Sequence, residues 1–301
     1  MTKAGFATII GRPNVGKSTL LNWIVGEKVS ITSSTPNTTR SAIRGILTDG
    51  DIQVIFVDTP GLHRPKTTLG GRLNDAARGA AEDVDVLIAM VDAGAAIGPG
   101  DRMVLQTLLD VCRKVNGPVP IVIVNKVDRT SRADIAAQLV ATVAAVEELA
   151  AESQRSEVAA RVEYFPMSAR TGDGVAPFVE AVRRAMPESH FLFDADEVSD
   201  VPEMFWIAEL VREQLVRKTF EEIPHSIHCR VAEYEWPHIT VEILVERESQ
   251  KGMVIGKGGA LLKDVGIAVR RQLPEGAFLE LRVRVESQWQ KRDDILDRLG
   301  Y

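Results

Sequence analysis

The chain has 301 residues, a formal net charge of −6, 45% hydrophobic residues and 26% charged residues. These values are typical of a globular protein of about two domains, and the negative charge excludes binding of nucleic acid or anionic lipid through bulk attraction. No apolar run approaches the roughly 18 residues of a membrane span, and we expect no signal peptide. Cys112 and Cys229 show no metal-ligand spacing, so we expect both to pack in cores in a reducing cytoplasm.

Residues 1–186 are predicted to form an α/β domain. Four apolar runs have the length of buried strands, and they cover residues 6–11, 84–92, 118–125 and 162–168. Two further strands flank Asp49-Gly50, which is a hairpin signal. Helical segments separate the strands, so the pattern predicts a mainly parallel six-stranded sheet covered on both faces, with one antiparallel edge strand.

A phosphate-binding loop follows the first strand. Residues 11–18 read GRPNVGKS, which fits G-x-x-x-x-G-K-[ST] at the required junction of strand and helix. Backbone N–H groups of such a loop point at phosphate oxygens. Lys17 supplies charge to the β and γ phosphates, and the Ser18 hydroxyl is a ligand for Mg²⁺. The loop therefore predicts binding of a nucleoside triphosphate with magnesium.

Two further segments are expected near the phosphates. A threonine in the segment 35–40, TPNTTR, typically completes the magnesium shell and releases it after hydrolysis; we favour Thr39, with Thr38 as the alternative. Asp58 ends the second strand of the hairpin, which places its carboxylate near the metal. Three residues later, the N–H of Gly61 is expected near the γ phosphate.

The nucleotide base is expected at the ends of the last two strands. An aspartate at position 128, in the motif NKVD, can accept hydrogen bonds from both N1–H and the exocyclic amine of guanine, whereas adenine offers no such donor pair. Ser168 and Ala169 follow the last strand and can support the base through a backbone N–H. Four motifs in this order at strand ends predict a GTPase.

Three overlapping sets of residues follow from these motifs. The predicted GTP-binding residues are Gly11, Asn14, Val15, Gly16, Lys17, Ser18, Thr19, Asp58, Gly61, Asn125, Lys126, Asp128, Ser168 and Ala169. The predicted metal ligands are Ser18, Thr39 and Asp58. The residues predicted to act in catalysis are Lys17, Asn14, Thr39 and Gly61.

The character of the sequence changes after residue 186. Residues 187–201 are acidic and without periodicity, and they are predicted to be a linker. Residues 202–301 are predicted to form an α+β domain that begins with an amphipathic helix. The apolar stripe of this helix is Met204, Ile207, Ala208, Val211 and Leu215.

Further elements are expected along this second domain. Alternating strands are predicted at 226–236 and 238–247, and a charged turn at 246–252 precedes a second glycine loop. A helix at 260–273, a strand at 278–286 and a terminal helix carrying Trp289, Leu296 and Leu299 complete the domain.

The second glycine loop, VIGKGG at 254–259, lacks the hydroxyl that follows the lysine of the first loop. It matches instead the G-x-x-G loop of a KH domain, in which glycines let single-stranded nucleic acid pass against the backbone. Residues 202–301 carry a net charge of −2, but the window 247–271 has six basic and two acidic side chains. The predicted RNA-binding residues are Lys251, Ile255, Gly256, Lys257, Gly258, Gly259, Lys263 and Arg270.

Taken together, the motifs resemble one family over nearly the whole chain. The matching stretches are GRPNVGKSTLLN, TTR, DTPGLHRPKTTLG, NKVD, MSARTGDGV, EEIPHSI, VERESQKGMVIGKGGALLKDVG, LELRVRV and a terminal GY. The chain resembles the bacterial Era family, and this resemblance implies a Ras-like GTPase domain followed by a type II KH domain. It also implies binding near the 3′ end of small-subunit ribosomal RNA and a role in assembling the 30S subunit. The location it implies is cytoplasmic with a peripheral inner-membrane fraction, and we expect the chain to be a monomer.

How GTP is cleaved is not evident from the motifs. Leu62 stands where many Ras-like proteins have a water-orienting glutamine, His63 is one position late, and no arginine finger is identifiable. Related GTPases with an asparagine at the place of Asn14 use it to hold a potassium ion. The resemblance therefore implies K⁺ as a second cation, while bracing of the loop by Asn14 is the alternative.

Two other functions stay open at this point. One is a nucleotide-gated RNA-binding scaffold whose hydrolysis is incidental, and the other is a membrane-associated signalling GTPase with a protein-binding C-terminal domain. The KH-type loop counts against the second of these.

Overall fold

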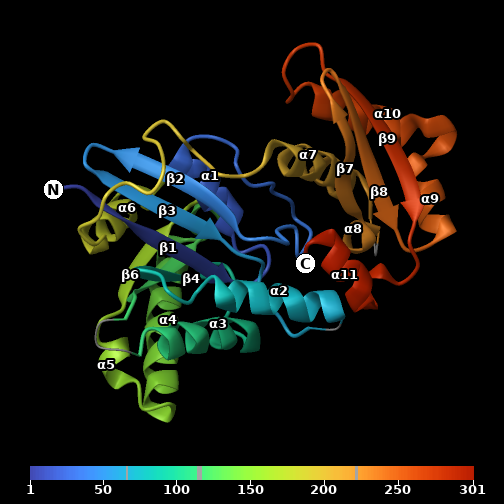
Figure 1. The fold of residues 1–301 in the computed structure, drawn as a ribbon. Helices are drawn as coiled ribbons and strands as arrows, with labels where there is room; N and C mark the ends of the chain where they lie inside the picture. Colours follow the sequence, from blue (N-terminus) through green and yellow to red (C-terminus); the bar gives the residue numbers. More distant parts are fainter. Residues whose placement is uncertain (66, 114–116, 221–222) are drawn as a thin grey trace. The chain divides into compact units, whose positions relative to one another are not determined.

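The computed structural model describes residues 1–65, 67–113, 117–220 and 223–301, and it divides the chain into two compact units. The first unit comprises Met1–Ser30, Thr39–Lys66 and Gly70–Asp200. The second comprises Ile31–Thr38, Thr67–Leu69 and Val201–Tyr301. Each unit has its own sheet (Figure 1).

The first unit is built on a six-stranded sheet, as the sequence predicts. Its strands are β1 (Lys3–Gly11), β2 (Ile43–Asp49), β3 (Ile52–Asp58), β4 (Val86–Asp92), β5 (Val119–Asn125) and β6 (Glu163–Met167). Their order across the sheet is β2-β3-β1-β4-β5-β6, and only the β2–β3 pair is antiparallel. The prediction of a mainly parallel sheet with one antiparallel edge strand is confirmed.

Helices cover both faces of this sheet (Figure 1). They are α1 (Lys17–Val25), α2 (Thr68–Gly79), α3 (Pro99–Val111), α4 (Arg132–Glu152), α5 (Ser156–Ala159) and α6 (Val175–Ala185). Side chains of α3 and α4, including Leu105, Leu108 and Val146, share a core with Leu87 and Val122 of the central strands. Burial on both faces explains why these strands appear in the sequence as continuous apolar runs.

The carboxyl ends of the parallel strands lie at one edge of the sheet. Ile9, close to the end of β1, is in register with Asp58, the last residue of β3. Asn125, which ends β5, is in register with Asp92 of β4 and Met167 of β6. In open α/β sheets, ligands bind outside these carboxyl ends. The predicted motifs are therefore brought to one edge.

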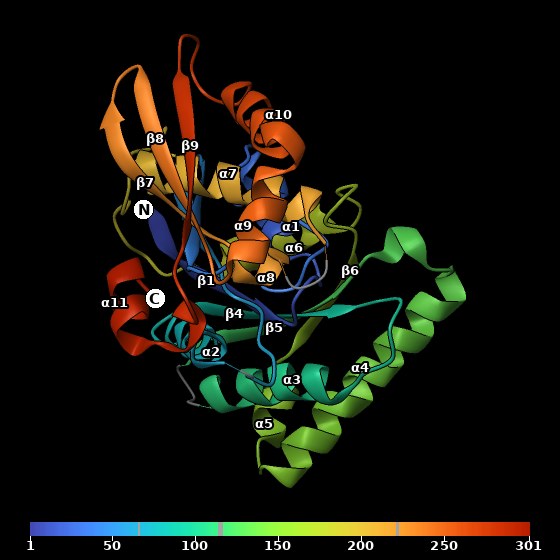
Figure 2. The same ribbon diagram turned by 90° about the vertical axis from the view of Figure 1, so that its right-hand side faces the viewer.

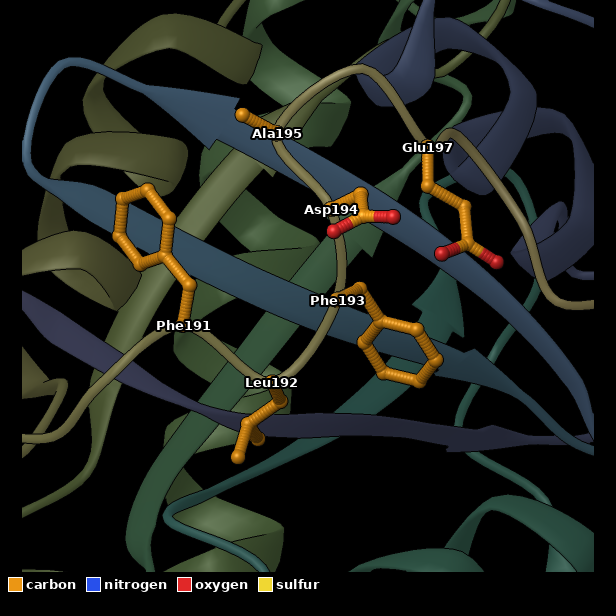
Figure 3. Close-up of a pocket in the computed structure, with 6 residues that line it drawn as sticks. All are labelled: Phe191, Leu192, Phe193, Asp194, Ala195 and Glu197. Atoms are coloured by element: carbon orange, nitrogen blue, oxygen red, sulfur yellow. The ribbon is translucent and has the colours of Figure 1, made fainter.

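The segment predicted as a linker lies against the first unit up to Asp200. Gln53 of β3, which is fully buried, accepts hydrogen bonds from the N–H groups of Leu192 and Phe193 and donates to the Phe193 carbonyl. Figure 3 shows this stretch crossing the β2–β3 pair, with Phe191 and Phe193 on either side of the loop. Backbone hydrogen bonds hold the segment, which explains its lack of apolar periodicity.

The second unit contains a three-stranded sheet and its own helices (Figure 2). In chain order these elements are α7 (Glu203–Lys218), α8 (Ile223–Ser226), β7 (His228–Glu235), β8 (His238–Val245), α9 (Glu248–Ile255), α10 (Ala260–Arg270), β9 (Phe278–Val285) and α11 (Asp293–Leu299). The sheet order is β7-β8-β9; the first pair is antiparallel and the second parallel. Residues from α7, α9 and α10 share one hydrophobic core with the inward side chains of the strands.

Three details of the second unit differ from the sequence prediction. The prediction of a turn over residues 246–252 is wrong, because α9 begins at Glu248 and the Gln250 side chain accepts the N–H groups of Glu246 and Arg247 at its start. Met204 is 50% exposed, since the core-facing side of α7 begins only at Ile207. Trp289 lies in a 3₁₀ turn ahead of α11 and is fully buried there.

Both cysteines are buried, and neither forms a disulfide within the part of the chain that the structure describes. Burial raises the pKa of the Cys112 thiol to about 12. Among the described residues, no helix combines the length and the apolar character needed to cross a bilayer.

Candidate nucleotide site and candidate RNA-binding loop

The first glycine loop is a closed turn around the Lys17 side chain. Lys17 is only 6% exposed, and its Nζ donates to the carbonyl oxygens of Gly11 and Arg12 at 3.2 and 3.1 Å. Gly16 has a φ of 113°, and a Cβ added there would lie 2.2 Å from the side-chain nitrogen of Asn125. Only glycine fits this position, so the loop backbone is held in one conformation at the start of α1.

Lys17 and Asp58 are both buried at the bottom of the site, and each has a perturbed pKa. Burial lowers the pKa of Lys17 to about 8, although the charge of Asp58 opposes this. Burial likewise raises the pKa of Asp58, opposed by Lys17 and by hydrogen bonds from hydroxyl groups. An anion beside Lys17 and a cation beside Asp58 would each favour the charged form. The site is electrostatically suited to a metal–phosphate ligand.

Three oxygen-bearing side chains converge beside the loop. Ser18 Oγ lies 2.5 Å from Asp58 Oδ2 and 2.9 Å from Thr39 Oγ1, and Thr39 Oγ1 lies 3.3 Å from the same carboxylate oxygen. The other oxygen, Asp58 Oδ1, is buried and has no hydrogen-bond partner in the part of the chain that the structure describes. Magnesium prefers such hard oxygen donors, so these three residues fit a magnesium ion that also binds phosphate oxygens.

The alternative threonine, Thr38, has other partners. Its hydroxyl donates to the Thr35 carbonyl at 2.7 Å and lies 2.6 Å from Ser33 Oγ. Thr39, and not Thr38, therefore lies beside Ser18 and Asp58. Ser30, which the sequence patterns did not single out, donates to Asp58 Oδ2 at 3.0 Å.

Gly61 lies directly against the first glycine loop. A Cβ at this position would come within 2.6 Å of the Pro13 nitrogen. The next residue, Leu62, donates its N–H to the Gly11 carbonyl at 3.0 Å, and its side chain is 1% exposed. This close approach brings the segment after β3 to the loop that is expected to hold the phosphates.

A cavity of about 120 Å³ lies beside the loop. It is lined by Gly16, Thr19, Asn125, Lys126, Asp128, Arg129, Ala169 and Arg170. Ser168 Oγ donates to Asp128 Oδ1 at 2.7 Å and holds the carboxylate at the cavity, and the other oxygen, Oδ2, lies 4.0 Å from Arg129 Nε. Predicted residues from three motifs thus border one space. Arg129 and Arg170, which also line it, were not among the predicted residues.

Asn125 connects the segments around this cavity. It is 2% exposed; its side-chain nitrogen donates to the Val15 carbonyl at 2.7 Å, and its side-chain oxygen accepts the Ala169 N–H at 2.9 Å. Lys126, with a φ of 72°, forms an ion pair with Asp92 at 2.7 Å. Asn125 therefore ties the phosphate loop to the base-side loop, and Asp92 is a supporting residue that sequence patterns missed.

Asn14 occupies the exposed middle of the phosphate loop. Its φ is 63°, a left-handed conformation that asparagine tolerates better than most residues. An exposed side-chain amide at this point is accessible to a ligand bound in the loop.

The second glycine loop is open. It lies between α9 and α10, with φ angles of 75°, 60° and 79° at Gly256, Gly258 and Gly259. A Cβ added at Gly258 or Gly259 would meet no atom of the described chain within 4 Å, its chain neighbours apart. Lys257 is exposed between them. Gly258 and Gly259 present open backbone to a ligand, as passage of a polymer requires, whereas a Cβ at Gly256 would lie 2.8 Å from Leu261 Cβ.

The other predicted RNA-binding residues lie on the two flanking helices. Lys251 and Ile255 are half-buried on α9, and Lys263 is exposed on the first turn of α10. Arg270 is at the opposite end of α10, about 15 Å along the helix axis from its start. The structure therefore brings together all of this set except Arg270.

Comparisons with known proteins match a GTPase family model and a KH domain model. Residues 6–126 match the family model described as "50S ribosome-binding GTPase", and residues 222–290 match the KH domain model. GTPase Era of Mycobacterium tuberculosis is 42% identical over 312 residues, which cover 99% of this chain and 98% of that protein. GTPase Era of Mycobacterium leprae is 41% identical over 311 residues, with 99% of each chain covered.

Two solved structures are similar along their whole length. A variant of Aquifex aeolicus Era bound to GDP and aluminium fluoride is 33% identical with a TM-score of 0.86, and the match covers 100% of this chain and 99% of that one. A complex of Era with MgGDPNP and nucleotides 1506–1542 of 16S ribosomal RNA is 34% identical with a TM-score of 0.88 and the same coverage.

Proposed function

Since the chain belongs to the Era family of GTPases, we propose that it is a GTP-hydrolysing assembly factor of the small ribosomal subunit. It binds the region at the 3′ end of small-subunit ribosomal RNA and assists maturation of the 30S subunit. The observation that carries this proposal is the pair of unlike glycine loops: one is closed around a buried lysine, and the other is open between two helices. The similar Era structure that holds both MgGDPNP and 16S ribosomal RNA supports the assignment of the two loops.

The geometry of the nucleotide site supports a role for each of its residues. Lys17 and the loop N–H groups bind the β and γ phosphates, and the Gly61 N–H faces the γ phosphate. Ser18 and Thr39 are the hydroxyl ligands of Mg²⁺, and Asp58 holds the ion directly or through water. Magnesium, when bound, neutralises charge on the phosphate oxygens. The converging oxygens and the partnerless Asp58 Oδ1 support this set.

Guanine is recognised by Asp128. Ser168 donates to Oδ1 of the Asp128 carboxylate. The other oxygen of Asp128, together with the lone pairs that Ser168 does not use, accepts hydrogen bonds from the base. Asn125 acts by hydrogen-bonding to Val15 and Ala169 and so joining the two loops, rather than by contacting the base itself. Lys126 and Thr19 line the cavity.

The chain is divided by function into a GTPase domain at 1–186, a connecting segment at 187–201 and a KH domain at 202–301. The RNA-binding surface is the second glycine loop with its flanking helices. Its contacts come from Ile255, Lys257 and the loop glycines, while Lys251, Lys263 and Arg270 contribute positive charge. The window 247–271, with four more basic than acidic side chains, supports this placement in a unit of otherwise negative charge.

Asn14 and potassium form the second part of the proposal. No glutamine follows Gly61, so another source of charge stabilisation is needed when the γ phosphate leaves. The exposed Asn14 amide would supply an oxygen ligand for K⁺ beside the phosphates, and the charge of that ion would stabilise the transition state. Turnover should be faster in K⁺ than in Na⁺ at equal ionic strength, and the difference should vanish in Asn14→Ala. Equal turnover in the two salts would show that Asn14 only braces the loop.

The protein acts as a monomer in the cytoplasm, where both of its cysteines stay reduced. A peripheral inner-membrane fraction stays a prediction of the family resemblance alone. The signalling alternative has no support from the second unit, whose family match is to an RNA-binding module.

RNA binding by the full-length protein tests the function. With a GTP analogue and Mg²⁺, a labelled RNA that copies the 3′ end of 16S ribosomal RNA should bind more tightly than a shuffled RNA of equal length and composition. Depletion of the protein from its cell should allow 30S precursors to accumulate. Equal affinity for both RNAs, together with normal 30S subunits after depletion, would overturn the proposal.

A further inference from the structure

The Asp58 carboxylate at the end of β3 has very different surroundings at its two oxygens. The hydroxyl groups of Ser18, Ser30 and Thr39 all lie at Oδ2, at 2.5, 3.0 and 3.3 Å. The second oxygen, Oδ1, is buried without a hydrogen-bond partner among the described residues. The last torsion of an aspartate has a broad preference, so contacts on one oxygen select an orientation. Here they leave Oδ1 for a ligand.

Ser30 differs from the other two residues in what its hydroxyl does. Ser18 and Thr39 are the proposed hydroxyl ligands of Mg²⁺, and Thr39 is expected to release the ion after hydrolysis. Ser30 lies outside both motifs, after the end of α1, and its hydroxyl donates to Asp58 Oδ2. Its contact with Asp58 therefore depends neither on the ion nor on the segment 35–40.

The main chain of Ser30 is held by one side chain of α1. Asn22 donates from Nδ2 to the Ser30 carbonyl at 2.7 Å, and its Oδ1 accepts the N–H groups of Val29 and Ser30 at 3.0 and 2.9 Å. Ser30 is 2% exposed, so its contact with Asp58 is shielded from water. Since α1 begins at Lys17, the helix that follows the phosphate loop also carries the support of Asp58.

We propose that Ser30 is a positioning residue of the magnesium site and that Asn22 holds it in place. The Ser30 hydroxyl keeps the Asp58 carboxylate in one orientation, with Oδ1 available to the ion or to a water bound to it, before and after GTP is cleaved. This inference rests on the proposed metal site and adds the residue that orients its carboxylate. The alternative is a structural role, in which Ser30 only satisfies a buried carboxylate and contributes to stability.

The two roles differ in their effect on magnesium affinity in the two nucleotide states. Mg²⁺ is titrated into the full-length protein loaded with a fluorescent, non-hydrolysable GTP analogue, and separately into the protein loaded with fluorescent GDP. Ser30→Ala should lower the affinity for Mg²⁺ about tenfold in both complexes, as loss of a group that supports a metal ligand commonly does. Thr39→Ala should lower it only in the GTP-analogue complex, because Thr39 is expected to release the ion after hydrolysis.

Two control variants separate the hydroxyl from a general loss of stability. Thr8 is fully buried in β1 and donates its hydroxyl to the Ala80 carbonyl at 2.7 Å. Thr8→Val removes this buried hydroxyl, so it should lower the melting temperature but leave magnesium affinity unchanged. Ser30→Thr keeps a hydroxyl at position 30, and its magnesium affinity should stay within about twofold of the unmodified protein.

Asn22→Asp tests the support of Ser30 without removing the hydroxyl. The carboxylate still accepts both N–H groups, but it places an oxygen against the Ser30 carbonyl where Nδ2 donates now. We expect about a threefold loss of magnesium affinity in both complexes, smaller than that of Ser30→Ala. The double variant should lose no more than Ser30→Ala alone, since both substitutions act through one group. Additive losses would contradict the role of Asn22.

Failure of this inference is distinct from failure of the proposed metal site. Unchanged magnesium affinity in Ser30→Ala, with a selective loss in Thr39→Ala, would overturn the role of Ser30 and leave the metal site in place. Equal losses in Ser30→Ala and Thr8→Val, or in Ser30→Ala and Ser30→Thr, would also overturn it. No effect of Thr39→Ala in either complex would instead remove Thr39 from the proposed metal ligands.

Discussion

The two glycine loops have similar sequences, GKS and GKGG, but differ in what surrounds them. Lys17 of the first loop is 6% exposed and donates to carbonyl oxygens of its own loop, whereas Lys257 of the second is exposed. A Cβ on Gly16 would collide with Asn125, whereas a Cβ on Gly258 would meet open space. Both loops use positive φ angles, but only the first is enclosed.

This difference explains which phosphate each loop suits. A closed loop surrounds a terminal phosphate group, and a buried lysine gives a strong, weakly screened charge. An open loop lets a phosphodiester chain enter at one side and leave at the other, and its exposed lysine is screened by salt. Substitutions in the first loop should therefore have large effects on nucleotide binding, and those in the second should have smaller, salt-dependent effects on RNA binding.

The largest expected effect is that of Lys17→Ala. Removal of a buried charge that pairs with phosphate should lower GTP affinity at least about 100-fold, or about 2.7 kcal/mol. Titration with a fluorescent GTP analogue in excess Mg²⁺ measures this. As a control, the affinity of the nucleotide-free protein for RNA should not change. A loss of GTP affinity smaller than about tenfold would show that the burial of Lys17 contributes little to GTP binding.

The next effect concerns the base cavity beside the first loop. Asp128→Asn replaces a double acceptor by a side chain with one acceptor and one donor, so we expect about a 50-fold loss of GTP affinity. Affinity for xanthosine triphosphate should improve, because its 2-oxo group accepts the new N–H. Competition between the two nucleotides measures the change. Unchanged GTP affinity would remove Asp128 from guanine recognition.

A smaller effect is expected for Gly258→Asp, which places a negative charge on the open loop. RNA binding should weaken at least about tenfold, or about 1.4 kcal/mol, with GTP affinity unchanged. Gly276→Asp is the matched control, because Gly276 also has a positive φ and an open surrounding, but lies between α10 and β9. Anisotropy of labelled RNA compares the two; equal losses would show a general charge effect rather than contact with the loop.

The smallest effect should come from Lys257→Ala. An exposed lysine makes one screened phosphate contact, so we expect about a threefold loss of RNA affinity at moderate salt. The plot of log affinity against log salt concentration should become shallower by about one unit. If Lys257→Ala lowered RNA affinity by as large a factor as Lys17→Ala lowers GTP affinity, the contrast between an enclosed and an open loop would be contradicted.

Several parts of the fold and site follow from local sequence. The strand runs, the hairpin at Asp49-Gly50 and the order of the motifs predict the six-stranded sheet and its carboxyl edge. The G-x-x-G motif predicts a loop between secondary-structure elements. The charged residues before this loop were predicted to form a turn, and helix α9 could not be predicted from them. That helix is evident only once Gln250 is seen to cap its start and Val254 to enter the core.

Short motifs were sufficient to predict the chemistry that neighbouring residues carry: a glycine loop with lysine and hydroxyl, an aspartate suited to guanine, and a second loop without the hydroxyl. The contacts that cross the fold could not be read from the motifs: Thr39 lies beside Ser18, His63 Nδ1 lies beside the Gly61 carbonyl, and Asn125 joins two loops. The physical reason is distance along the chain. A motif acts through residues a few positions apart, whereas the Thr39 hydroxyl and the main chain of His63 are held by Asp58 and Asn74, which folding brings to them.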